Sequence, residues 1–75
     1  MDEVQAKVLV TKDIAEGLPT HPEWVRQCMD SAETSMNELA QDRGRKVSQP
    51  PRFVDARDTR LGYVELTFVA PTEVR

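Results

Sequence analysis

Apolar residues recur at every second position near the start of the chain, at Val4, Ala6, Val8 and Val10. This period of two predicts a strand over residues 4–11 with one buried face, and Leu9 is expected to cover part of the other face. The same period returns over residues 63–70, where the apolar set is Val64, Leu66, Phe68 and Ala70. Pro71 is expected to end this last strand, and residues 72–75 are expected to fray.

A helical period separates these two segments. Apolar residues three, four or seven positions apart form one stripe: Trp24, Val25, Cys28, Met29, Ala32, Met36, Leu39 and Ala40. The stripe predicts one long amphipathic helix within residues 19–44, packed against a sheet. Thr20 and Glu23 have the spacing of a capping box, with Pro22 in the first turn, and Gly44 is expected to end the helix in the left-handed conformation.

In chain order, the second of the three strands is predicted over residues 53–57. Pro50 and Pro51 precede it and cannot donate to a strand ladder, so this strand is expected at an edge of the sheet. Residues 58–62 predict a hairpin loop in which Gly62 supplies a positive φ. The sequence therefore predicts an α+β domain of βαββ order, with a three-stranded antiparallel sheet of order 1-3-2 and the helix on one face. The alternative places the first strand in the centre, parallel to the second.

Length and cysteine content add a few limits. The 75 residues allow one domain, predicted over residues 1–71, and a small core. One helix covers only one face of a small sheet, so dimerisation or docking on a larger partner is expected. The chain has one cysteine. No signal peptide or membrane span is expected, because residues 1–3 lack a basic start and the apolar stretch near Val8 is too short. These features favour a cytoplasmic protein without an internal disulfide.

The residues do not indicate catalysis or metal binding. His21 and Cys28 are seven residues apart, about 10 Å along a helix, which is too far to share one ion. Cys28 has no base within one helical turn, and the three glycines do not form a phosphate-binding loop. We therefore expect no enzyme activity, no metal, no cofactor and no small-molecule ligand. The acidic pairs are read as a solvated helix face: Asp30 with Glu33, and Glu38 with Asp42.

Charge is distributed unevenly along the chain. Residues 1–42 carry nine acids and three bases, whereas residues 43–60 carry six bases and two acids. A nucleic-acid interface is therefore the alternative function, with Phe53 or Tyr63 stacking on a base. Its candidate cations are Lys46, Arg52, Arg57 and Arg60. The acids Asp55 and Asp58 dilute this patch, and the net charge of −3 is unfavourable for a phosphate binder.

Protein binding is the function that these features favour. The open face of the sheet is one candidate surface, through Tyr63, Thr67 and Val69, and the acidic helix face is the other, through Glu33, Asn37 and Glu38. We expect a non-enzymatic interaction or regulatory module that acts as a homodimer or on a larger partner. The small size alone suggests an inhibitor or accessory protein of a virus or mobile element.

Overall fold

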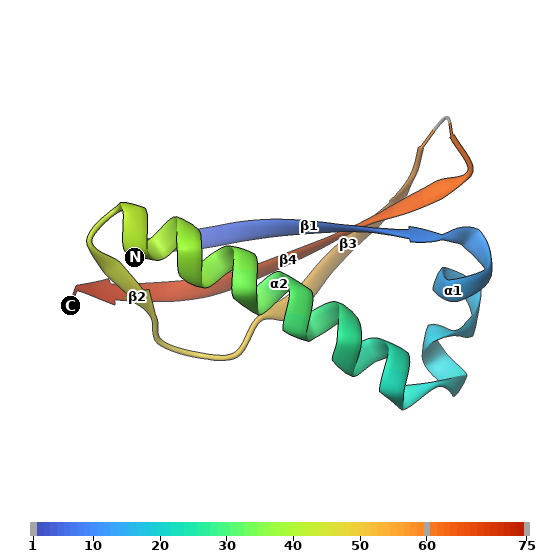
Figure 1. The fold of residues 1–75 in the computed structure, drawn as a ribbon, viewed down its shortest axis with the longest axis horizontal. Helices are drawn as coiled ribbons and strands as arrows, with labels where there is room; N and C mark the ends of the chain where they lie inside the picture. Colours follow the sequence, from blue (N-terminus) through green and yellow to red (C-terminus); the bar gives the residue numbers. More distant parts are fainter. Residues whose placement is uncertain (1, 60, 75) are drawn as a thin grey trace.

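A computed structural model describes residues 2–59 and 61–74 of the chain. Its elements follow one another as β1 (Glu3–Thr11), α1 (Lys12–Gly17), a 3₁₀ turn η1 (Leu18–Thr20), α2 (Pro22–Asp42), β2 (Arg45–Val47), β3 (Arg52–Asp58) and β4 (Tyr63–Val74) (Figure 1). The predicted α+β class is confirmed, because a four-stranded antiparallel sheet carries the long helix α2 on one face. None of the helices within residues 2–59 and 61–74 combines the length and the apolar composition that a membrane span requires.

The strand β4 lies at the centre of the sheet. It pairs with β1 from Tyr63↔Thr11 to Pro71↔Glu3, and on its other side it pairs first with β3 and then with β2. The predicted central, antiparallel position of the last strand is correct, and the alternative with a central first strand is wrong. The expected three-stranded order is not matched exactly, since β2 adds a fourth strand and α1 a second helix.

Pro71 does not end β4, as the sequence suggested. Residues 72–74, which were expected to fray, pair with β2 and belong to the sheet, whereas residue 75 lies outside the described residues. The Pro71 carbonyl accepts a hydrogen bond from the Ser48 N–H, which shows that the backbone of Pro71 faces β2 and β3. In a strand, the N and C=O of one residue point to the same edge of the sheet. The position where Pro71 lacks an N–H therefore lies between the end of the β3 pairing and the start of the β2 pairing, where no ladder hydrogen bond is lost.

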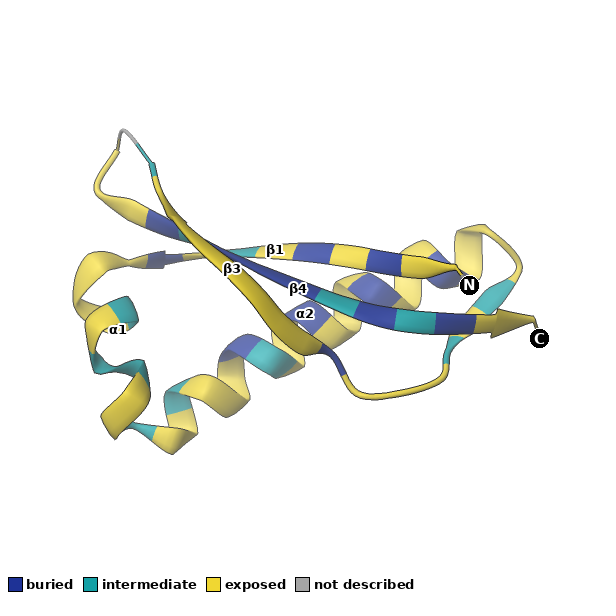
Figure 2. Cartoon of the chain, turned by 180° about the vertical axis from the view of Figure 1, so that it is seen from behind, coloured by how far each residue is buried: buried dark blue, intermediate teal, exposed yellow. Residues whose placement is uncertain are grey.

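The core lies between α2 and the helix-facing side of β1 and β4. Figure 2 shows buried residues alternating with exposed ones along β1. On α2, Ala32, Met36 and Ala40 are completely buried. The small alanines let the C-terminal half of α2 approach the sheet closely, whereas Trp24 and Val25 at the other end stay half-buried or exposed. Consequently the N-terminal half of α2 diverges from the strands (Figure 1).

The expected capping box of Thr20 and Glu23 is not formed. Helix α2 begins at Pro22, its N-cap is His21, and no side chain of the described residues caps it. Thr20 instead closes η1 and donates its Oγ1 hydroxyl to the Gly17 carbonyl at 3.0 Å. The residue before a proline is disfavoured in helical conformation, so His21 cannot readily serve as the first helical residue after a Thr20 cap. At the other end, Gly44 has φ +70°, as the sequence predicted.

Candidate functional site

An apolar groove lies between the N-terminal half of α2 and the hairpin of β3 and β4. We call it the β3 groove; its volume is about 390 Å³. The described residues that line it are all apolar: Ala15, Leu18, Pro19, Val25, Cys28, Phe53, Ala56, Leu66 and Phe68. The groove exists because α2 diverges from the sheet at this end, which leaves β3 without a helix above it.

The register of β3 turns its apolar side chains towards this groove. Phe53 lies opposite Phe68 and Ala56 opposite Leu66, while a bulge between Phe53 and Asp55 takes up one additional residue. The rings of Phe53 and Phe68 meet edge to face, with centroids 5.9 Å apart and planes at 71°. Phe68 is 4% exposed and belongs to the core, whereas Phe53 is 56% exposed. Phe53 is therefore a wall of the groove that rests on a buried aromatic ring.

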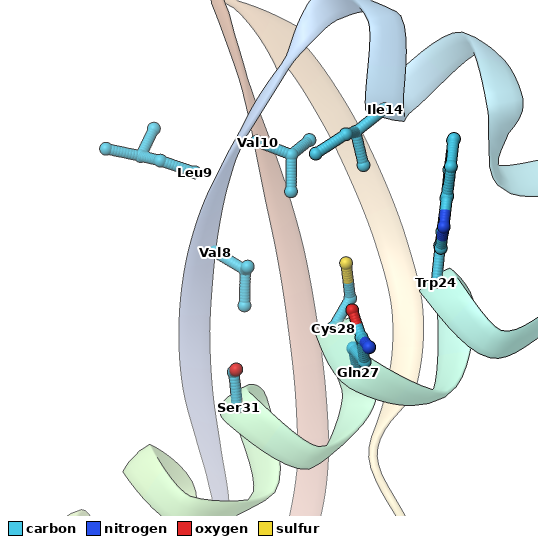
Figure 3. A pocket seen from close by; sticks show the side chains of 8 residues that line it. All are labelled: Val8, Leu9, Val10, Ile14, Trp24, Gln27, Cys28 and Ser31. Carbon is cyan, nitrogen blue, oxygen red and sulfur yellow. The ribbon is translucent and has the colours of Figure 1, made fainter.

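A second groove, of about 370 Å³, lies on the opposite side of α2, towards β1 (Figure 3). In Figure 3, Val10, Ile14 and Cys28 point into it, whereas Leu9 projects from the other side of β1. Gln27 and Ser31 contribute polar atoms to its lining. It is thus more polar than the β3 groove, and Cys28 lies between the two.

Cys28 is a packed side chain in this arrangement. It is 7% exposed, and burial raises the pKa of its thiol. A raised pKa keeps the thiol protonated at neutral pH, whereas a nucleophilic cysteine needs the thiolate. Within residues 2–59 and 61–74, no three histidine, cysteine or acidic side chains are grouped as metal ligands would be.

The open face of the sheet carries Tyr63, Thr67 and Val69, as their alternation with the buried residues of β4 requires. Thr67 is only 8% exposed and Val69 is half-buried, while Tyr63 is 43% exposed. Two ion pairs cross this face: Lys7 with Glu65 at 3.4 Å, and Arg52 with Glu3 at 3.4 Å. Charged side chains therefore interrupt the apolar surface that the sequence suggested there.

The helix residues named as a second interface are Glu33, Asn37 and Glu38, and all three are exposed on α2. Since α2 covers the sheet face opposite Tyr63, its solvent side and the open sheet face point in opposite directions. The two predicted sets therefore cannot contact one partner surface together. They are two separate candidate surfaces.

The cations proposed for nucleic-acid binding are spread along the sheet. Lys46 pairs with Glu73 at 3.2 Å and Arg52 with Glu3 at 3.4 Å. Arg57 is exposed on β3, and Arg60 lies outside the described residues. Lys46 is opposite position 73 of β4 and Arg57 opposite position 65, about 26 Å apart at the rise of a strand. Lys46 and Arg57 therefore do not share one patch.

Sequence reasoning did not identify the β3 groove. It assigned Val25 and Cys28 to a uniform core stripe and Phe53 to possible stacking on a base. The available signal was the gradient along α2 from Trp24 to Ala40, because large residues at one end and small residues at the other make a helix diverge from a sheet.

Comparisons of this chain with protein-family models, with curated proteins and with solved structures gave no match. Its function is therefore inferred from the chemistry of the surfaces described above.

Proposed function

We propose that this chain is a non-enzymatic protein-interaction module that binds an apolar side chain of a partner protein in the β3 groove. One observation carries the proposal: the groove is lined only by apolar residues and one of its walls, Phe53, is 56% exposed. Covering an exposed aromatic ring in a concave apolar site is the usual basis of a strong contact between proteins.

The lining of the groove favours a protein over a small polar ligand. Sites for small molecules combine apolar walls with a few polar groups that orient the ligand, and among the described residues the β3 groove has no polar side chain in its lining. A partner protein can instead fill the groove with one apolar side chain, because Phe53 is exposed at its wall. This combination supports an interaction or regulatory role for a chain of this size.

Photo-crosslinking from defined positions tests the proposal. A benzoylphenylalanine replaces Phe53 in the groove, Tyr63 on the open sheet face, or Asn37 on the outer side of α2, in cells that naturally make the protein. We expect one adduct of discrete mass from position 53 and none from the other two. Adducts from position 63 or 37 alone would show that the partner uses one of the other surfaces.

A paired substitution in the groove provides the matched control. Phe53→Leu keeps an apolar wall and should retain the partner in a pull-down, whereas Phe53→Asp should lose it. Since Phe53 is more than half exposed, both variants should keep the far-ultraviolet circular dichroism of the parent protein. Equal retention by both variants would count against the groove as the binding site.

Nucleic-acid binding is the weaker proposal because Lys46 and Arg52 are already in ion pairs. Nuclease treatment before the pull-down tests it in the same experiment. If Arg52 and Arg57 hold nucleic acid, replacing both by alanine should remove an affinity that falls steeply with salt. An affinity that does not change with salt would exclude this alternative.

A further inference from the structure

The outer edge of β3 is open. In the part of the chain that the structure describes, β3 pairs only with β4, and all seven of its residues are exposed. Thr59 donates its N–H to the Tyr63 carbonyl at 2.9 Å. This bond shows that the backbone of Thr59 faces β4. Because backbone groups alternate between the two edges of a strand, the N–H and C=O of Ala56 and Asp58, which are three positions and one position before Thr59, face away from β4. They form a free row of donors and acceptors beside the β3 groove.

We propose that a second copy of this chain pairs with this edge, with the two β3 strands antiparallel and Ala56 opposite Ala56 of the other copy. A two-fold axis through this pair makes the contact self-complementary, as in most homodimers. Ala56 would then exchange two backbone hydrogen bonds with its counterpart, since its N–H and C=O point outward.

The charges of β3 select this register. With Ala56 at the centre, Asp55 of each copy lies opposite Arg57 of the other, which gives two opposite-charge pairs on the open face of the sheet. Centring the contact on Asp55 would place two carboxylates opposite each other, and centring it on Arg57 would place two guanidinium groups together. Cross-strand neighbours of like charge are destabilising. Charged side chains on an edge strand commonly prevent pairing with another strand. The order Asp55–Ala56–Arg57 nevertheless allows two β3 strands to pair when Ala56 is at the centre.

The other face of the junction fits as well. Residues opposite each other in antiparallel strands lie on the same face, so both helices α2 lie on one side of a continuous sheet. The side chains at the centre of that side are two alanine methyl groups, which leave the space between the helices open. The two β3 grooves then adjoin across the junction, with Phe53 of each copy at its outer part. The bulge between Phe53 and Asp55 keeps the new ladder short, so a reversible dimer is expected.

Charge exchange tests this dimer without a change to the core. Asp55→Arg leaves two arginines on the edge and Arg57→Asp leaves two aspartates, so each single variant should dissociate at least about tenfold more readily than the parent protein. A mixture of the two variants restores opposite charges at both positions. Sedimentation equilibrium should therefore show the parent as a monomer–dimer system, each single variant shifted to monomer, and the mixture forming a heterodimer.

Two further variants distinguish pairing through the β3 edge from association through another surface. Ala56→Pro removes the outward N–H but no bond to β4, and it should also give monomers. Circular dichroism of each variant verifies that the fold persists. A parent protein that stays monomeric at every soluble concentration would overturn the inference. A dimer that persists in both Asp55→Arg and Arg57→Asp but is lost in the double variant Tyr63→Ala with Val69→Asp would also overturn the inference, because such a dimer would form through the open sheet face.

The dimer does not depend on the groove having a partner. A monomeric parent that still gives the adduct from position 53 would refute the edge pairing and leave the proposed function intact. A dimer whose position 53 crosslinks only to the second copy would support the edge pairing and refute the proposed binding of a partner protein in the groove.

Discussion

The two phenylalanines that meet across β3 and β4 should contribute very differently to stability. Phe68 is 4% exposed and Phe53 is 56% exposed, although they are directly opposite in the register. Removing a fully buried phenylalanine side chain costs about 3–5 kcal/mol, because it combines lost burial with a cavity. Full burial of such a side chain is worth about 1.5–3 kcal/mol, and Phe53 realises less than half of that. With the aromatic contact included, Phe53→Ala should cost about 1–3 kcal/mol.

A domain of this length has a total stability of about 4–11 kcal/mol. Phe68→Ala should therefore remove a large part of it, whereas Phe53→Ala should leave a folded protein. Urea unfolding followed by the fluorescence of Trp24 and by circular dichroism measures both, at one low protein concentration. The double variant adds the coupling between the rings, expected at about 0.5–1.5 kcal/mol. A Phe53→Ala cost equal to that of Phe68→Ala would mean that Phe53 is part of the core and that the groove is closed.

Three further perturbations have defined outcomes. The rings of His21 and Trp24 are stacked, with centroids 3.8 Å apart and planes at 7°. Gly17→Ala places a methyl group against the Trp24 ring, 3.2 Å from His21 Nδ1, so it should open this stack, shift the fluorescence of Trp24 and lower the melting temperature. Unchanged fluorescence would contradict the close contact. Burial raises the pKa of the Cys28 thiol, so the folded state retains this proton, and stability should fall as the pH rises above 9.0. Cys28→Ala should remove that part of the pH dependence. Thr72→Val removes the acceptor of the Arg45 Nε hydrogen bond at 2.8 Å and should lower the free energy of unfolding in urea by about 1–3 kcal/mol. An unchanged free energy of unfolding would mean that water replaces the Thr72 hydroxyl as the acceptor.

The alternation of apolar residues was enough to place β1 and β4 and to assign their faces. Val64 to Ala70 form the most apolar alternating segment, and such a strand is most stable when it has neighbours on both sides. Its central position could therefore be predicted. The helix period similarly identified Ala32, Met36 and Ala40 as buried.

Other features depend on contacts between distant segments. The three residues of β2 are too few for a detectable period, and this strand is fixed by bonds from Arg45 to Thr72, 27 positions later. From the sequence alone, Pro71 indicates the end of a strand. Only the register shows that the position without an N–H lies between the pairings of β4 with β3 and with β2. Thr20 satisfied the spacing of a capping box, but the restriction that Pro22 places on His21 was the stronger local effect.

The candidate site was less accessible to sequence reasoning than the fold. A helical stripe shows which side of α2 faces the sheet, but it does not show at which end the helix diverges. That divergence leaves Phe53 exposed although its neighbour Phe68 is buried. The free edge of β3 was expected from the prolines before it, whereas the outward direction of Ala56 follows only from the register.

The central position of β4 has a consequence for how the protein is made. Every strand pairing in the described sheet includes β4, so a nascent chain on the ribosome cannot form any part of the sheet until this segment has emerged. Before then, among the described elements, only the local helical segments α1, η1 and α2 have a means of forming. Glu3 has to meet Pro71 across almost the whole chain, and such distant pairing makes folding slow compared with that of helical domains of the same size. During synthesis β1 therefore remains unpaired with the rest of this sheet until β4 has emerged from the ribosome.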